Sequence, residues 1–272
     1  MTSVDSLLTS HSYWSQAVKS EVEYKVLTPS AASDGQSLPL ILHLHGAMSS
    51  AASLESARSA YERAWLTGEF PPSVVVCAST PTIGGFYIDY PNGKRWESLV
   101  GDELPQHLRG SFPLSGEQAI IGFSMGGYAA LKIALRNPLR YLAVAALCPA
   151  IFPGETADLI PSGNLPFPLD ELNAAMGSDV ESYRLNSVYG IIRKNYNNII
   201  KYSPGVFFDC GQDDEFSLHD GAYYLHRLLS DLSIAHEFRS VPGANHADKH
   251  VDTRRDHAVK FLGKAFTERR KP

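Results

Sequence analysis

Short runs of apolar residues are spaced along this chain, and helix-favouring segments separate most of them. Nearly continuous apolar runs indicate strands buried on both faces of a parallel sheet, and they occur at residues 39–46, 74–78, 119–121, 142–148 and 205–210. Alternating polar and apolar positions predict half-buried strands at residues 22–27 and 236–241. Helical composition is found at residues 51–66, 102–108 and 251–266. The pattern predicts one α/β domain over residues 1–272, with a mostly parallel central sheet covered by helices on both faces.

Two parts of the chain depart from this alternation. Residues 1–20 are polar with isolated apolar positions, and we expect an arm lying on the domain. Residues 151–203 form a long insertion after the strand at 142–148, the sixth strand of the pattern, and only short helices are predicted within it, at 170–176 and 187–199. Its apolar and aromatic side chains favour a lid-like wall for a substrate; a solvent-facing excursion is the alternative.

Composition excludes several classes of function. Hydrophobic residues make up 44% of the chain and charged residues 19%, which suits a large core, and the net charge of -5 leaves no basic surplus for nucleic acid. No apolar stretch is long enough to span a membrane, and the N-terminus lacks the basic start and apolar core of a signal peptide, so a cytoplasmic protein is expected. Three widely spaced cysteines lie in apolar runs and predict buried free thiols without a disulfide or zinc site: Cys77, Cys148 and Cys210.

The most informative motif follows the strand at residues 119–121. Ser124 lies in the pattern Gly-x-Ser-x-Gly, formed with Gly122 and Gly126, and a helix-favouring segment follows it. A serine on a sharp strand-to-helix turn has a strained backbone, and its neighbours two positions away must lack a Cβ. The turn exposes the hydroxyl at the positive end of the next helix, so Ser124 is predicted to be a nucleophile.

An activated serine needs a histidine base and a carboxylate that orients it, in the chain order serine, acid, histidine. Four carboxylates compete after the strand at 205–210; we favour Asp214 over Asp213 because it lies three residues beyond the turn glycine. After the strand at 236–241 we favour His246, in the loop, over His250, which is placed to enter the last helix.

The oxyanion of the reaction needs two backbone amides. The amide of Met125 follows the serine, and the turn His45-Gly46-Ala47 lies in the loop after the third strand, where the second amide is expected. We therefore predict an oxyanion hole formed by the Ala47 and Met125 amides.

These motifs together resemble the esterase D branch of the α/β-hydrolases, which includes S-formylglutathione hydrolases, tributyrin-type carboxylesterases, feruloyl esterases and mycolyl transferases. The resembling stretches cover most of residues 38–265, and they are His45-Gly46, the segments 86–89, 96 and 102–105, the serine motif at 122–128, the acid loop at 210–214 and the glycine before His246. The resemblance implies the α/β-hydrolase fold and the same triad of Ser124, Asp214 and His246.

The resemblance also implies that Tyr87, Asp89 and Trp96 approach the acyl or alcohol pocket, with core packing as the alternative for Trp96. The insertion adds Phe152 as a candidate contact to substrate. The chain departs from the branch at two places. The loop after the third strand lacks the cysteine-containing segment of S-formylglutathione hydrolases, and Ala-Asp-Lys follows His246 where Asp-Trp is frequent.

The sequence therefore predicts a serine carboxylesterase that cleaves a small-molecule ester, or a thioester, through an acyl-enzyme. An acyltransferase or thioesterase with the same machinery is the alternative, since only the acceptor differs. A non-catalytic binding protein on this fold is disfavoured because both the serine and the histidine are present. No metal or organic cofactor, nucleic acid or membrane partner is expected, and homo-oligomer formation is left open.

Overall fold

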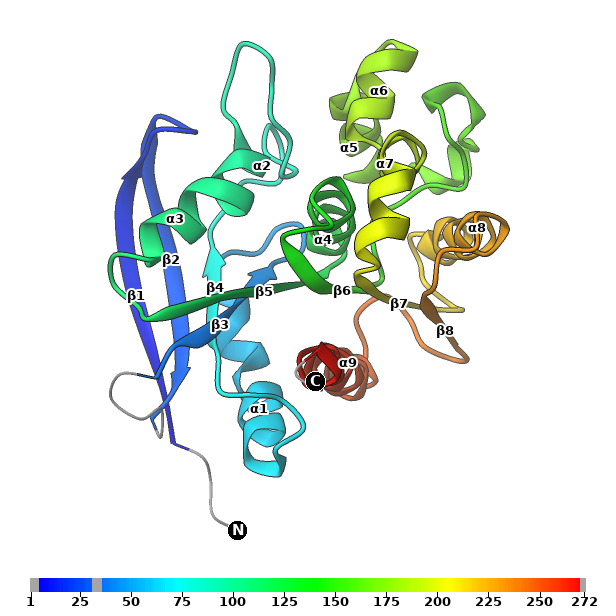
Figure 1. The fold of residues 1–272 in the computed structure, drawn as a ribbon. Helices are drawn as coiled ribbons and strands as arrows, with labels where there is room; N and C mark the ends of the chain where they lie inside the picture. Colours follow the sequence, from blue (N-terminus) through cyan, green and yellow to red (C-terminus); the bar gives the residue numbers. More distant parts are fainter. Residues whose placement is uncertain (1–4, 31–35, 270–272) are drawn as a thin grey trace.

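The computed structural model describes residues 5–30 and 36–269, and its organising element is one sheet of eight strands in the order β1-β2-β4-β3-β5-β6-β7-β8 (Figure 1). The strands from β3 to β8 are parallel, while β2 is antiparallel to both β1 and β4. The strand bounds are β1 Ser6–Ser15, β2 Ser20–Pro29, β3 Leu38–Leu44, β4 Val74–Ala78, β5 Leu114–Phe123, β6 Tyr141–Leu147, β7 Gly205–Gly211 and β8 Glu237–Val241.

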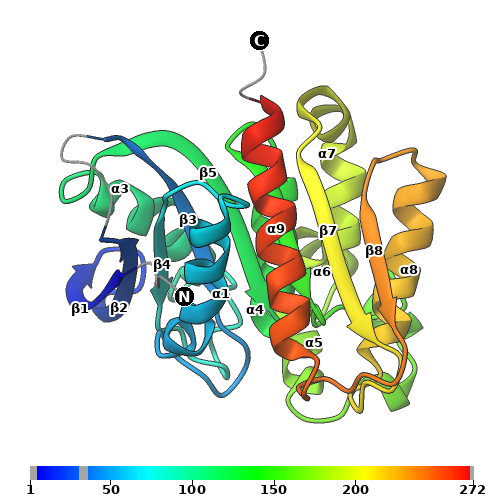
Figure 2. The ribbon, with the colours of Figure 1, turned by 90° about the horizontal axis from the view of Figure 1, so that it is seen from below.

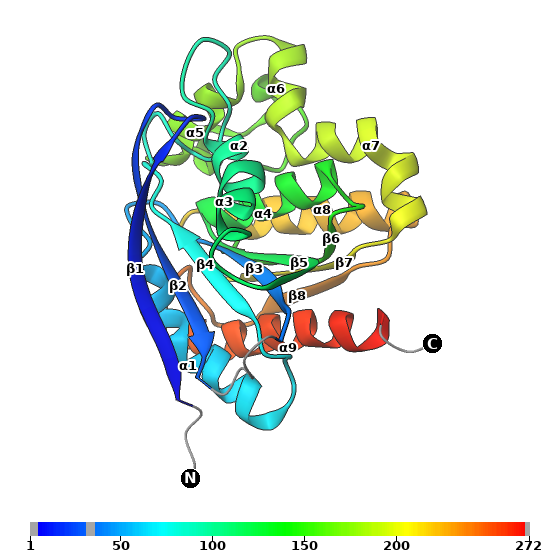
Figure 3. The ribbon, with the colours of Figure 1, turned by 60° about the vertical axis from the view of Figure 1, so that its left-hand side comes forward.

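Helices cover both faces of this sheet, as the apolar runs predicted. α1 and α9 lie on one face, and α3, α4, α7 and α8 lie on the other (Figures 1 and 3). The helix bounds are α1 Ser53–Thr67, α2 Trp96–Ser98, α3 Leu104–Leu108, α4 Met125–Arg136, α5 Leu169–Met176, α6 Val180–Asn186, α7 Val188–Tyr202, α8 Leu218–Asp231 and α9 Val251–Arg269. A π-helical turn, Leu99–Glu103, joins α2 to α3, and two 3₁₀ turns, Ala157–Leu159 and Ser162–Asn164, precede α5.

The core is divided by the sheet into two apolar layers. One packs the sheet against α1 and α9, and the larger one packs it against α4, α7, α8 and the 151–203 insertion. The central strands β3, β4 and β6 are buried along their whole length, which explains their continuous apolar sequence. The predicted α/β class is confirmed. No helix among the described residues is long and apolar enough to cross a bilayer.

The N-terminal segment is where the expectation was wrong. Residues 6–15 do not form an irregular arm; they form β1, which pairs with β2 in an antiparallel hairpin from Ser6↔Pro29 to Ser15↔Ser20. β1 is the edge strand of the sheet, and most of its side chains are partly or fully exposed. An edge strand without a buried face has no apolar alternation to reveal it, which is why the sequence pattern missed it. Residues 1–4 of the predicted arm lie outside the described residues.

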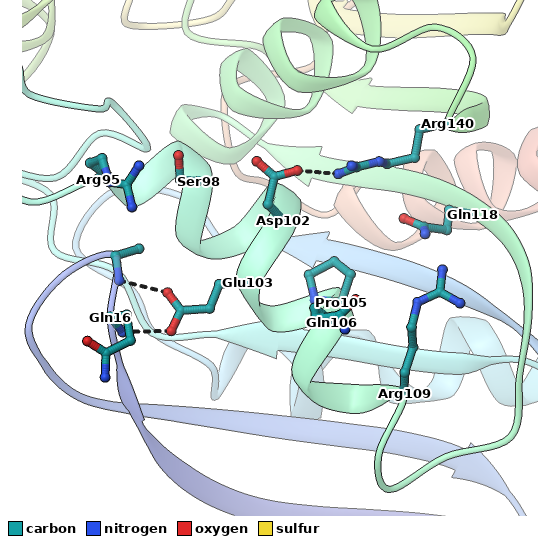
Figure 4. A pocket seen from close by; sticks show the side chains of 11 residues that line it. Gln16, Arg95, Ser98, Asp102, Glu103, Pro105, Gln106, Arg109, Gln118 and Arg140 are labelled. Carbon is teal, nitrogen blue, oxygen red and sulfur yellow. Dashed lines mark hydrogen bonds and ion pairs between the residues drawn. The ribbon is translucent and has the colours of Figure 1, made fainter.

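The carboxylate of Glu103 connects the turn of this hairpin to the helical segment that contains α2 and α3. Glu103 accepts a hydrogen bond from Ser15 Oγ at 2.8 Å. It also accepts from the backbone amides of Gln16 at 2.7 Å and Ala17 at 2.8 Å, and Figure 4 shows Glu103 beside Gln16. The turn and the α2–α3 segment together border a polar cavity of 520 Å³, and neither Ser124 nor His246 lines it. No pattern of charges in the sequence predicts that Glu103 binds the turn at residues 15–17.

We predict that Glu103→Ala lowers the free energy of unfolding by about 1–3 kcal/mol, because two backbone amides and a hydroxyl lose a charged acceptor. The matched control is Asp102→Ala, one residue away, which removes an exposed ion pair with Arg140 and should cost no more than about 1 kcal/mol. Urea denaturation followed by circular dichroism measures both. Equal losses in the two variants would contradict the docking role of Glu103.

Candidate active site

Ser124 occupies a strained turn between β5 and α4. Its backbone has φ 55° and ψ -116°, a conformation that L-residues rarely adopt. The two flanking glycines make the turn sterically feasible: a Cβ on Gly122 would lie 2.1 Å from the Gly126 oxygen, and one on Gly126 would lie 2.2 Å from the Leu44 oxygen. The Gly-x-Ser-x-Gly pattern is therefore required by close backbone packing as well as by the turn.

Three buried side chains from three different loops form a continuous hydrogen-bonded chain. The Ser124 hydroxyl lies 3.0 Å from His246 Nε2, and His246 Nδ1 lies 2.8 Å from Asp214 Oδ2. Ser124 lies between β5 and α4, Asp214 follows β7 and His246 follows β8, so all three lie at the carboxyl edge of the parallel strands, where β7 and β8 end in Figure 2. With Nδ1–H donating to the carboxylate, Nε2 is left to accept the serine proton.

The other carboxylates of the acid loop have different partners. Asp209 is bonded to Arg254 through two contacts of 2.7 and 2.9 Å. Glu215 accepts the backbone amide of His246 at 2.9 Å and so fixes the loop that carries the imidazole. Asp213, which the sequence left as the alternative acid, is exposed. The structure thus brings Asp214, and not Asp213, to His246.

The imidazole of His246 is held between two aromatic rings. The ring centroids of Phe123 and Phe216 lie 5.0 and 4.9 Å from that of the imidazole. Burial lowers the pKa of His246, but the hydrogen bond to Asp214 and the neighbouring Cys148 oppose this, and the pKa rises to about 9. Burial likewise raises the pKa of Asp214, yet the His246 contact holds it below its usual range. A neutral imidazole is therefore favoured at alkaline pH.

An apolar cavity opens directly beside the serine hydroxyl. Its volume is 280 Å³, and Ala47 and Met125, the two residues predicted to supply oxyanion amides, both line it. Met125 is the first residue of α4, so its amide belongs to the group of first-turn donors without an intrahelical acceptor. The remaining lining residues besides Ser124 and His246 are Met48, Phe86, Phe123, Ala150, Pro168, Leu169, Leu172, Phe216, Leu218 and Ala247.

None of the four predicted substrate contacts lines this cavity. Tyr87 is buried, and its hydroxyl donates to the His45 carbonyl at 3.2 Å. Asp89 accepts from the Ser98 amide and hydroxyl at the start of the 96–108 helical segment. Both side chains thus make hydrogen bonds within the protein.

The other two candidates, Trp96 and Phe152, are also engaged in contacts within the protein. The Trp96 indole is buried and donates to the Gly84 carbonyl at 3.1 Å. Phe152 is buried in the core, and its carbonyl accepts from Tyr189. The insertion contributes to the cavity through Pro168, Leu169 and Leu172 instead. Sequence reasoning missed these because an apolar face on a short helix carries no sign of whether it faces core or substrate.

Comparison with known proteins places this geometry in a family. A family model described as a putative esterase matches residues 15–234. Curated relatives include S-formylglutathione hydrolases of Rattus norvegicus, 32% identical over 160 residues that cover 57% of this chain and 50% of the relative, and of Paracoccus denitrificans, 32% identical over 140 residues that cover 48% and 44%. The chain thus spans about half the length of these curated relatives.

Solved structures extend the similarity over nearly the whole chain. A ferulic acid esterase superposes with a TM-score of 0.78 at 20% identity, over 97% of this chain and 99% of that one. An S-formylglutathione hydrolase from Agrobacterium tumefaciens superposes with a TM-score of 0.79 at 22% identity, over 97% of each chain. The predicted α/β-hydrolase fold is confirmed by these likenesses.

We predict that Asp214→Asn lowers kcat by roughly 10⁴-fold with little change in substrate binding, since an amide no longer fixes the imidazole tautomer. Asp213→Asn, its exposed neighbour, should change kcat less than about twofold, because exposed side chains remote from the reacting atoms contribute little. Steady-state kinetics on a p-nitrophenyl ester measure both. A larger loss at position 213 than at 214 would overturn the assignment of the acid.

Proposed function

This chain belongs to the family of putative esterases, and we propose on that premise that it is a serine carboxylesterase acting through an acyl-enzyme. The observation that carries the proposal is the hydrogen-bonded chain from Ser124 through His246 to Asp214 beside an apolar cavity. The family of the chain, the strained turn at the serine and the names of its relatives all support the same chemistry.

The geometry supports a two-step reaction. His246 Nε2 takes the proton of Ser124 as its oxygen attacks the ester carbonyl. We assign stabilisation of the oxyanion to the backbone amides of Ala47 and Met125, two residues that line the cavity. The resulting imidazolium is stabilised by Asp214 and then protonates the leaving alcohol. Water, activated by the same imidazole, releases the acid and restores the serine.

The lining of the cavity indicates the kind of acyl group. Among the described residues that border it, His246 is the only basic or acidic side chain, and the rest apart from Ser124 are apolar. We propose an ester with an uncharged, apolar acyl chain, and Leu169 and Leu172 of the insertion as part of its wall. A thioesterase or acyltransferase with the same machinery is the second candidate, supported by the S-formylglutathione hydrolase relatives, which carry that thioester in their name.

Two finer features belong to the same proposal. A cytoplasmic location is supported by the three buried free thiols, since reduced cysteines are typical of reducing compartments. Self-association through the edge of the sheet is supported by β1, which exposes Leu7 and Trp14, and gel filtration with light scattering would detect it.

The direct test of function is Ser124→Ala. We expect turnover of p-nitrophenyl esters to fall by roughly 10⁶-fold, because the nucleophile is removed while the circular dichroism spectrum stays unchanged. Parallel assays with an acyl-thioester and with added alcohol acceptors separate esterase, thioesterase and transferase activity. Near-wild-type turnover in a folded Ser124→Ala protein would show that this serine is not the nucleophile.

The wall of the acyl cavity can be tested at Leu172. Leu172→Ala enlarges the cavity and should raise the rate on long-chain relative to short-chain esters about tenfold, in keeping with the 1–3 kcal/mol that one pocket methylene is worth. Leu172→Phe should shift the ratio the other way. The control, Phe167→Ala, removes a side chain of the same insertion that is 61% exposed and does not line the cavity. The same ratio in all three variants would contradict a wall at Leu172.

A further inference from the structure

Behind the candidate triad lies a cluster of two thiols and a carboxylate. Cys148 directly follows β6 and Cys210 lies in the adjacent strand β7, and both are fully buried. Their sulfur atoms are 3.7 Å apart, and the Cys210 sulfur is 3.6 Å from Asp214 Oδ2. The three potential ligand atoms all lie within 4.8 Å of one another. No short metal-binding motif contains both cysteines, because 62 positions separate them in the sequence.

These distances match the separations between ligand atoms around a tetrahedral metal ion. Zinc binds thiolate at about 2.3 Å and carboxylate oxygen at about 2.0–2.2 Å, so tetrahedral angles place two sulfurs about 3.7 Å apart and a sulfur about 3.5 Å from an oxygen. Soft thiolates select zinc and similar thiophilic cations over magnesium or calcium. We propose that Cys148, Cys210 and Asp214 form an inhibitory binding site for a zinc-like thiophilic divalent cation.

The charges around the cluster favour thiolate ligands. Arg254 Nη2 lies 2.7 Å from the Cys148 sulfur, and the same guanidinium is neutralised by its two contacts with Asp209. Each thiol that binds the cation gives up its proton to solvent, and no oxidation or reduction is involved.

Occupancy of this site would be incompatible with the catalytic arrangement. Asp214 Oδ2, the oxygen 3.6 Å from the Cys210 sulfur, is also the oxygen that accepts the Nδ1–H of His246. A cation on that oxygen competes with the imidazole for it and removes the contact that fixes the tautomer. The inhibitory part of the inference therefore rests on the proposed function, whereas the binding part stands on the cluster alone. Because both sulfurs are buried, we expect binding to be slow and inhibition to depend on time.

The test uses the metal-free protein of residues 1–272. One equivalent of Co²⁺ should give the near-ultraviolet absorption of cobalt–thiolate bonds, and Zn²⁺ should displace it with a stoichiometry of one per chain by elemental analysis. Preincubation with Zn²⁺ should lower esterase turnover at least tenfold, and EDTA should restore it. Cys148→Ser and Cys210→Ser should each abolish the cobalt–thiolate band and the inhibition.

Cys77→Ser is the matched control, since it removes the third buried free thiol of the chain from a strand that carries no part of the cluster and should leave binding and inhibition unchanged. A missing cobalt–thiolate band in the wild-type protein overturns the site, whatever the activity. Zinc inhibition that persists in both cluster variants assigns inhibition to another site and also overturns the proposal. A cobalt–thiolate band in a protein without any esterase activity would keep the site and refute the proposed function instead.

Discussion

The conformation of Ser124 is the constraint on which the rest of the site depends. With φ at 55° the residue turns the chain sharply between β5 and α4, and the turn brings the Gly122 and Gly126 backbones closer than any side chain would permit. Such a conformation costs of order 1–3 kcal/mol and persists only where surrounding packing holds it. Here β5 is a central strand and every residue of α4 up to Leu135 is buried, so the fold supplies that packing.

A second set of buried contacts connects this helix to the loop expected to form the oxyanion hole. Lys132 of α4 is fully buried; its ammonium donates to the Tyr87 carbonyl at 2.7 Å and pairs with Glu97 at 3.1 Å. The Tyr87 hydroxyl in turn donates to the carbonyl of His45, two residues before Ala47. Tyr87 therefore connects α4, which follows Ser124, to the loop that carries Ala47, and it does so without lining the cavity. This connection is a physical reason for a tyrosine in the segment 86–89, which resembles the esterase D branch.

Much of this arrangement could be predicted from sequence where local rules decide it. Continuous apolar runs located β3, β4, β6 and β7 because buried parallel strands must be apolar, and the glycines around Ser124 are required by the backbone itself. Features that depend on how distant parts of the chain pack together could not be predicted in this way. The edge strand β1 carries no burial pattern, and the side chains that border the cavity, such as Leu172, differ from core leucines only in what the fold places opposite them. Asp214 and Asp213 are neighbours in sequence, and only the course of the loop after β7 separates a buried partner of His246 from an exposed carboxylate.

The central claim is that Ser124 becomes acylated during turnover. The most direct measurement is mass spectrometry of the protein quenched with acid within the first turnovers of a p-nitrophenyl ester, followed by tryptic mapping. We expect the chain to gain the mass of one acyl group, carried by the peptide that contains Ser124, together with a burst of p-nitrophenol equal to the enzyme concentration. An acyl group on another residue, or turnover with neither burst nor adduct, would contradict the proposed role of Ser124.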